Sequence, residues 1–277
     1  TFVNLFSSYV MRKYPGLSSE FEKRLDLVAL GTLADLMPLV DENRVLVKLG
    51  IERINSVERE AIHELLLQQN LLGKQLGTTD IGWQISPLIN ATGRLGVPDK
   101  AAEIFITEDP SERRRLVTEV IGLNKERKKL GDSAWNTILP QAQKSYDALE
   151  ERMVLVSDDG IHRGVTGIIA ARLVQYFGVP AAVVAHLKDH LVGSMRSTNG
   201  FEVKEFLSKF EDLFIDYGGH DFAAGFSLPF DNYEAFHRRF TEEARAIEHR
   251  ESVEVPIEVD AELPPEYLTP ELHNIVE

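Results

Sequence analysis

The chain is organised around a glycine-rich stretch that reads Gly218-Gly-His-Asp-Phe-Ala-Ala-Gly225. Because two consecutive glycines carry no Cβ atom, the backbone there can adopt positive φ angles and a ligand can approach the main chain closely. His220 can donate a hydrogen bond, accept one or carry a charge near neutral pH. Taken alone, the stretch is equally typical of a tight turn with a core histidine and of a binding site.

The length and composition of the chain are those of a soluble globular protein. Its 277 residues, with 43% hydrophobic and 27% charged content, predict roughly two domains. The absence of cysteine excludes a disulfide framework and fits a reducing compartment, so we predict a cytoplasmic protein. No apolar run approaches the roughly 18 residues of a membrane span, and we expect no membrane partner. Thr1 stands within a helical pattern over residues 2–14 in place of a starting methionine, which predicts a fragment.

The net charge of −14 means that the molecule as a whole repels polyanions. Nucleic-acid binding would therefore require a local gathering of basic residues. Such a gathering occurs in one predicted helix, with Arg113, Arg114, Arg115, Lys125, Arg127, Lys128 and Lys129. Glutamates are interleaved with them, so the pattern favours a solvated helix face for most of these charges.

An aspartate within an apolar run is the first candidate site residue. Helical patterns follow one another over residues 2–14, from about residue 20, over 43–54 and over 58–72. Asp35 lies in the apolar run Leu25–Leu39. A carboxylate is rarely buried in such a run unless it is paired, hydrogen-bonded or bound to a metal. Asp35 is therefore either a cap or turn residue or a metal ligand.

The middle of the chain combines a predicted loop with a long helical pattern. Residues 85–96 contain a proline, an asparagine and two glycines, which predicts a loop that holds Asn90 and Arg94. An arginine held on a fixed scaffold suits a phosphate group. From Asp99 to about Tyr146 the pattern is helical, interrupted at Asp109-Pro110, which predicts a long connector between two domains.

The C-terminal part has the pattern of an α/β domain. Strands are predicted over 153–156, 181–185, 191–197 and 253–259, and helices after Gly167, over 201–210 and over 233–248. The glycine loop before the first of these helices predicts a weak anion site, since free N–H groups point outward at a helix N-terminus. His186 and His190 flank a predicted hairpin turn, with a metal pair as the less favoured interpretation.

Further motifs stand in order along the chain. They are Leu27–Leu39, Ile89–Leu95, Leu123–Arg127, His162–Gly167, Gly193–Ser197 and Gly218–Gly225. Together they resemble the motifs of the RecJ single-strand-specific exonucleases, which are part of the DHH phosphoesterase superfamily. The first is similar to the family's fourth catalytic motif, the second to its interdomain motif and the third to its connecting helix. The last three are similar to the DHH-associated C-terminal domain.

The resemblance implies an α/β protein with four parts. Residues 1–76 would be the C-terminal, helical part of a DHH catalytic domain. Residues 77–149 would form the interdomain loop and the long connecting helix. Residues 150–250 would be the DHH-associated nucleic-acid-binding domain, and 251–277 the truncated β segment that begins an oligonucleotide-binding-like domain.

The resemblance also implies a function and a set of site residues. It implies a 5′–3′ exonuclease specific for single-stranded DNA, acting in DNA repair and recombination with two Mn²⁺ or Mg²⁺ ions. Asp35 would bind the metal and share catalysis with His220. The residues expected to bind the nucleic acid and its phosphates are Asn90, Arg94, His162, Gly164, Ser194, Arg196, Gly218, Gly219 and His220. A single-strand-binding protein or a helicase would be a candidate partner.

The sequence departs from the family's pattern in three respects. No adjacent pair of histidines occurs, the upstream aspartates that complete two metal sites are absent, and Leu88 stands where the family often has a basic residue. We therefore expect this chain to be the substrate-binding part, to bind the ions weakly and to be inactive alone. Two alternatives stay open: a phosphoesterase of short oligonucleotides or dinucleotides, and a non-catalytic interaction protein with a DHH fold.

Overall fold

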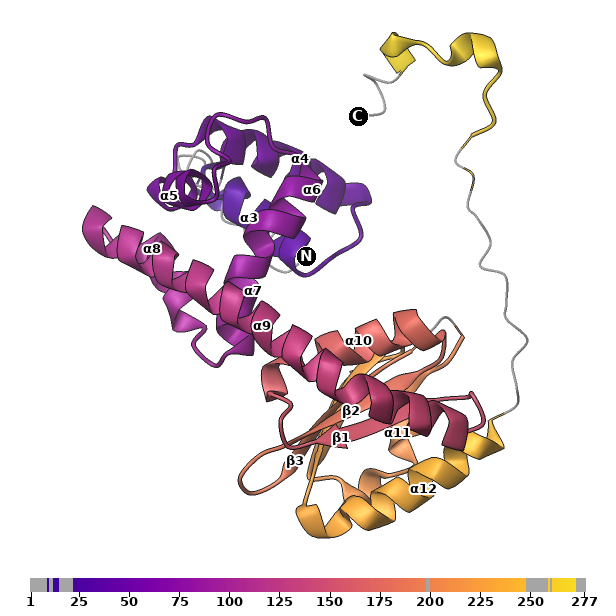
Figure 1. The fold of residues 1–277 in the computed structure, drawn as a ribbon. Helices are drawn as coiled ribbons and strands as arrows, with labels where there is room; N and C mark the ends of the chain where they lie inside the picture. Colours follow the sequence, from indigo (N-terminus) through magenta and orange to yellow (C-terminus); the bar gives the residue numbers. More distant parts are fainter. Residues whose placement is uncertain are drawn as a thin grey trace.

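The computed structural model describes residues 9, 12–14, 22–197, 200–247, 259 and 261–272. Within these residues, helices and one five-stranded sheet form two packed parts that a single long helix joins (Figure 1). No helix among them is both long and apolar enough to cross a membrane. Most of the predicted helix at 2–14 and of the predicted strand at 253–259 lies outside the described residues.

The N-terminal part is a group of helices around an aliphatic core. Its elements are α3 (Leu25–Ala34), α4 (Asp41–Ser56), α5 (Glu60–Gln68), α6 (Thr78–Asp80), the π-helical turn η2 (Ile81–Ile85), α7 (Ser86–Arg94) and α8 (Asp99–Ile106). Helices α3 and α4 pack closely because Gly50 has no side chain, and a Cβ there would overlap the Leu25 carbonyl oxygen. The helices predicted over 43–54 and 58–72 are confirmed as α4 and α5.

The predicted loop at 85–96 is wrong, because most of these residues form η2 and α7. Pro87 lies in the first turn of α7, directly after the π-helical turn η2. Ile85, Leu88 and Ala91 are buried at helical spacing. Packing of this apolar face outweighs the helix propensity lost at Gly93, which is about 1 kcal/mol.

Helix α9 (Pro110–Ala148) joins the two parts of the molecule. Its 39 residues span about 58 Å at 1.5 Å per residue. The first half packs against α5, α7 and α8, and the second half lies on the sheet (Figure 1). The predicted solvated face is confirmed for Arg115, which pairs with Glu112 and Glu119. Helices α8 and α9 confirm the helical pattern predicted from Asp99 to about Tyr146 and its interruption at Asp109-Pro110.

Gly122 offers a direct test of this helix. It lies at an exposed position of α9, and a Cβ added there would meet no atom within 4 Å. We expect Gly122→Ala to raise the free energy of unfolding by about 0.5–1 kcal/mol, because alanine loses less backbone entropy than glycine in a helix. Equilibrium denaturation measures this change. A lower stability would contradict the open surroundings of Gly122.

The C-terminal part is a five-stranded sheet with the strand order β1-β2-β3-β5-β4. The strands are β1 (Val154–Asp158), β2 (Ala181–His186), β3 (Leu191–Arg196), β4 (Asp216–His220) and β5 (Ala223–Leu228). Only the β1–β2 pair is parallel, and α10 (Thr166–Phe177) makes the crossover between these two strands. The predicted hairpin at 187–190 is confirmed, with Leu187 N donating to His190 O at 2.9 Å.

The two faces of the sheet are covered unequally. On one face, α11 (Val203–Ser208) and α12 (Tyr233–Ala246) enclose a core of phenylalanines: Phe206, Phe210, Phe226, Phe236 and Phe240. On the other face, α9 and α10 pack on β1, β2 and part of β3. Alternate residues of β5 and most of β4 on that face keep solvent access. An open strip of sheet therefore lies beside α10.

Candidate nucleic-acid interface

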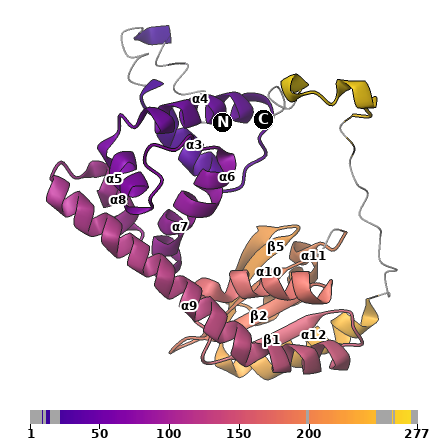
Figure 2. The same cartoon turned by 45° about the horizontal axis from the view of Figure 1, so that its top comes forward.

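The helical part and the sheet meet where Arg94 contacts Gly164. Arg94 ends α7, and Gly164 lies in the short turn η3 (Arg163–Val165) before α10. A Cβ at Gly164 would overlap the Arg94 carbonyl oxygen, so only glycine fits there. The Gly164 N–H donates to Nδ1 of His162 at 3.1 Å, which fixes the loop. Two predicted site residues, His162 and Gly164, thus hold a junction between the end of α7 and η3. Figure 2 shows the backbone of this region, where α7 leads from the helical part toward α9 and α10.

Ser194 and Arg196 project from the same face of β3 toward the start of α10. The hydroxyl groups of Ser194 and Thr166 share a hydrogen bond of 2.9 Å. The Arg196 guanidinium lies over Gly167, where an added Cβ would stand 2.7 Å from Nη2. Its Nη1 donates to the Met195 carbonyl oxygen at 2.8 Å. A glycine in the first turn of α10 therefore makes room for the arginine.

Three guanidinium groups gather at this junction, those of Arg94, Arg127 and Arg196. Burial lowers the pKa of each of them below its usual value, although Arg94 keeps solvent access. The charge of Arg94 further lowers the pKa of Arg127 and of Arg196, which places it close to both.

None of the three arginines has an ion pair with a carboxylate among the residues that the structure describes. Nε of Arg127 is buried and has no hydrogen-bond partner there. Arginine stays protonated in proteins, so the cluster is a concentration of positive charge in a molecule of net charge −14. An anion with several oxygen atoms is the natural complement of such a cluster.

Asn90 links this junction to Asp35. The Asn90 amide Nδ2 donates to the Ala34 carbonyl oxygen at 3.2 Å, one residue before Asp35. Asp35 is the C-cap residue of α3 and is exposed, which agrees with the cap alternative and leaves its carboxylate accessible.

Among the described residues, Asp35 belongs to no cluster of metal-binding side chains. No group of three His, Cys, Asp or Glu residues within the described ranges could hold an ion. Mg²⁺ takes six oxygen ligands, and Asp35 alone does not meet that need. The described residues of this chain therefore do not fit a two-metal centre.

His220 lies two strands from Arg196 on the same face of the sheet. The register pairs Ala223 of β5 with Arg196 on one side and with His220 on the other. Side chains of directly paired residues share a face, and two strand spacings separate these two by about 10 Å. The next row of this face places Gly225 and Gly218 beside Ser194. The side chains of the two rows are small or absent at Ala223, Gly225 and Gly218. They leave space above this face of the sheet between Ser194, Arg196 and His220.

The tight turn considered for the stretch Gly218–Gly225 is present, but both glycines precede it in strand β4, and His220 is exposed and is not a core histidine. The turn follows at Asp221 and Phe222. Gly219 has a φ of 151°, and a Cβ there would overlap the Ala223 carbonyl oxygen. The glycine is thus required by the close approach of β5.

The predicted site residues fall into two neighbouring groups. The first group lies at the junction of α7, η3, α10 and β3 and consists of Arg94, His162, Gly164, Ser194 and Arg196, together with Asn90 on α7. Gly218, Gly219 and His220 lie on β4, across β5. Arg127 was missed, because its neighbours Lys125, Lys128 and Lys129 made it one member of a charge run. The motif Leu123–Arg127 was the available signal.

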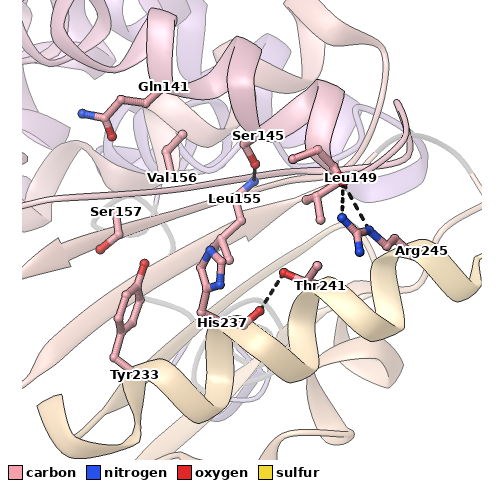
Figure 3. Close-up of a pocket in the computed structure, with 11 residues that line it drawn as sticks. Gln141, Ser145, Leu149, Leu155, Val156, Ser157, Tyr233, His237, Thr241 and Arg245 are labelled. Atoms are coloured by element: carbon pink, nitrogen blue, oxygen red, sulfur yellow. Dashed lines mark hydrogen bonds between the residues drawn. The ribbon is translucent and has the colours of Figure 1, made fainter.

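One cavity lies away from these residues. It has a volume of about 430 Å³ and lies between α9, β1 and α12, with Ser157, Tyr233, His237 and Arg245 among its lining (Figure 3). Burial raises the pKa of Tyr233, and a hydrogen bond to Ser157 opposes that rise. A smaller cavity of about 290 Å³ between α9 and α10 is lined by Arg127, Lys128 and Arg172 and adjoins the arginine cluster.

Comparisons with known proteins show what the chain is similar to in sequence and fold. The model of the DHHA1 domain matches residues 150–246. The chain is 35% identical over 226 residues to the single-stranded-DNA-specific exonuclease RecJ of Bacillus subtilis. This alignment covers 80% of this chain and 28% of the relative. It is 36% identical over 214 residues to RecJ of Thermus thermophilus, covering 77% of the chain and 30% of the relative.

Solved structures give the same picture. The crystal structure of RecJ in complex with Mg²⁺ from Thermus thermophilus superposes with a TM-score of 0.72 at 34% identity, over 82% of this chain and 35% of the other. A manganese-bound exonuclease RecJ superposes with a TM-score of 0.69 at 33% identity, over 82% of this chain and 56% of the other. The chain spans less than half the length of the curated relatives it matches, between 28% and 44%.

Proposed function

We propose, since the chain belongs with the RecJ exonucleases in sequence and fold, that it is the substrate-binding part of a 5′–3′ exonuclease specific for single-stranded DNA. The observation that carries this proposal is the cluster of Arg94, Arg127 and Arg196, three guanidinium groups without carboxylate partners among the described residues. In this proposal the phosphate backbone of one DNA strand supplies the missing negative charge.

The residues of the junction take different roles along the bound strand. We assign the 5′-terminal phosphate to Arg196 and Ser194, because they lie at the start of α10 beside an open strip of sheet. Arg94 and Arg127 would bind the following phosphates on the way toward Asn90 and Asp35. His220 would face the terminal nucleotide across Ala223 and contact the phosphate to be cleaved.

Hydrolysis is proposed for the complete enzyme and not for this chain. The solved RecJ structures from Thermus thermophilus are complexes with Mg²⁺ and with Mn²⁺, and Asp35 is the residue here that the family's motif would make a metal ligand. When bound, such ions activate a water molecule and stabilise charge on the phosphodiester. Asp35 would supply one ligand where several are needed.

The proposed parts are the C-terminal end of a catalytic domain at 1–76, a connecting region at 77–149, a nucleic-acid-binding domain at 150–250 and the start of a further domain at 251–277. The match of the DHHA1 model to residues 150–246 supports the third part. The connecting region contains helix α7 where a loop was expected, and α9 is the expected long helix.

Binding of fluorescent oligonucleotides to the 277-residue chain tests the proposal. We expect a 20-nucleotide single strand to bind more tightly than the matching duplex. The logarithm of its binding constant should fall by about 0.7 per phosphate contact for each tenfold rise in salt concentration. Arg94→Ala should weaken the binding about tenfold and reduce the salt slope, since one charge-assisted contact is lost. In Mn²⁺ the chain should release no mononucleotides.

Arg115→Ala is the matched control, because it removes the same charge from an exposed site on α9 that pairs with Glu112 and Glu119. It should leave the binding unchanged. Equal affinity for single strand and duplex would refute a single-strand site. Steady release of mononucleotides would refute the proposed division between binding and hydrolysis.

A further inference from the structure

Trp83 lies on the same exposed helix face as Asn90 and Arg94. The segments α6, η2 and α7 follow one another without a break from Thr78 to Arg94 (Figure 1). Ile81, Ile85, Leu88 and Ala91 are buried along one side of this rod. The opposite side carries Trp83, Asn90 and Arg94, with Pro87 between the first two, at steps of three or four residues. Such steps place side chains on one face of a helix.

The side chain of Trp83 is 79% exposed. Within the described residues it makes no ring–ring or cation–π contact, whereas Trp135 is only 8% exposed and packs against Arg172 and Tyr176. Trp83 also sits in the π-helical turn η2, a local distortion that recurs at functional sites. The fold of the described residues therefore does not explain why an indole stands at this position.

The position of Trp83 relative to the arginines points to its ligand. Trp83 precedes Asn90 by seven positions, a rise of about 10 Å at 1.5 Å per residue, on the side away from Arg94. A strand that lies with its 5′ end on Arg196 and Arg94 and passes Asn90 would reach Trp83 next. Aromatic side chains beside a positively charged path stack on bases without regard to sequence, since every base has a π face.

We propose that Trp83 is a base-stacking residue that binds single-stranded DNA on the 3′ side of the phosphate held near Asp35. This inference rests on the proposed function, because it takes its direction from the arginine cluster. It assigns to η2 a binding role that extends the interface beyond the terminal nucleotide. Short substrates that end before η2 would not use Trp83.

The tryptophan content of the chain makes a direct experiment possible. The sequence has two tryptophans, so in Trp135→Phe the emission comes from Trp83 alone. Addition of a 20-nucleotide oligothymidylate to this variant should quench the emission, because a base stacked on the indole replaces water. A 20-unit abasic strand carries the same phosphates without bases and should bind without this quenching.

Affinities give a second and independent readout in the otherwise unchanged chain. Trp83→Ala should weaken oligothymidylate binding by about 5- to 150-fold, the range for loss of one stacked base. Trp83→Phe should restore most of the affinity. Binding of the abasic strand and of a dinucleotide should be the same in all three proteins.

The outcomes separate this inference from the proposed function. If oligothymidylate binds but neither the Trp83 emission nor the affinity of Trp83→Ala changes, the stacking role is refuted and the proposed function stands. If neither oligonucleotide binds, both are refuted. An emission change that depends on protein concentration and not on DNA would mean that Trp83 contacts a protein surface, which also refutes the stacking role.

Discussion

Arg196→Ala is expected to weaken the binding of a 5′-phosphorylated single strand by about one to two orders of magnitude, and that of an unphosphorylated strand much less. The first loss corresponds to roughly 1.5–3 kcal/mol for a charge-assisted contact. The difference between the two strands arises because Arg196 lies at the start of α10 with Ser194, where we place the terminal phosphate. Titration of labelled oligonucleotides with and without a 5′-phosphate measures both values.

Two further variants make this prediction sharper. Arg196→Lys keeps the charge but lacks the planar fork of donors, so it should recover only part of the lost affinity. Gly167→Ala keeps Arg196 and places a methyl group 2.7 Å from its Nη2, so the guanidinium must shift and the preference for the phosphorylated end should shrink. Equal losses for both strands in Arg196→Ala would show that Arg196 contacts internal phosphates instead of the end.

The sheet could be predicted from the sequence where hydrophobic patterns are unambiguous. The strands β1, β2 and β3 and the hairpin at 187–190 are confirmed, because continuous apolar runs bounded by turn residues leave few alternatives. Residues 85–96 were wrongly predicted as a loop. The proline, asparagine and glycines there favoured a loop, but these residues form a helix because Ile85, Leu88 and Ala91 are buried at helical spacing. The helical spacing of these apolar residues was the signal in the sequence that indicated a helix.

The candidate site could be predicted in part. The motifs placed Arg94, Ser194 and Arg196 in it, and the structure brings these residues to one junction. Arg127 and Trp83 were missed, because their significance depends on tertiary position. A run of lysines and arginines does not reveal which cation loses its solvent, and an aromatic residue in a helix is usually core. The roles of all these residues stay predictions.

Gly164→Ala is expected to both destabilise the protein and loosen its DNA-binding junction. The added Cβ would overlap the Arg94 carbonyl oxygen, and a backbone atom cannot rotate away as a side chain can. Either η3 or the end of α7 must move. Overpacking at a tight contact costs about 1–3 kcal/mol, occasionally more, and we expect the upper part of that range.

The effect of Gly164→Ala should appear in both thermal stability and single-strand affinity. Thermal unfolding followed by circular dichroism should show a melting temperature several degrees lower, at about 2–4 °C per kcal/mol. Gly122→Ala, the same substitution in open surroundings on α9, should raise it. Single-strand affinity should fall in Gly164→Ala although no charged or polar side chain is removed, because Arg94 no longer stands beside Arg196. Unchanged affinity with lowered stability would mean that the arginines bind the strand independently, and the junction would then have a structural role only.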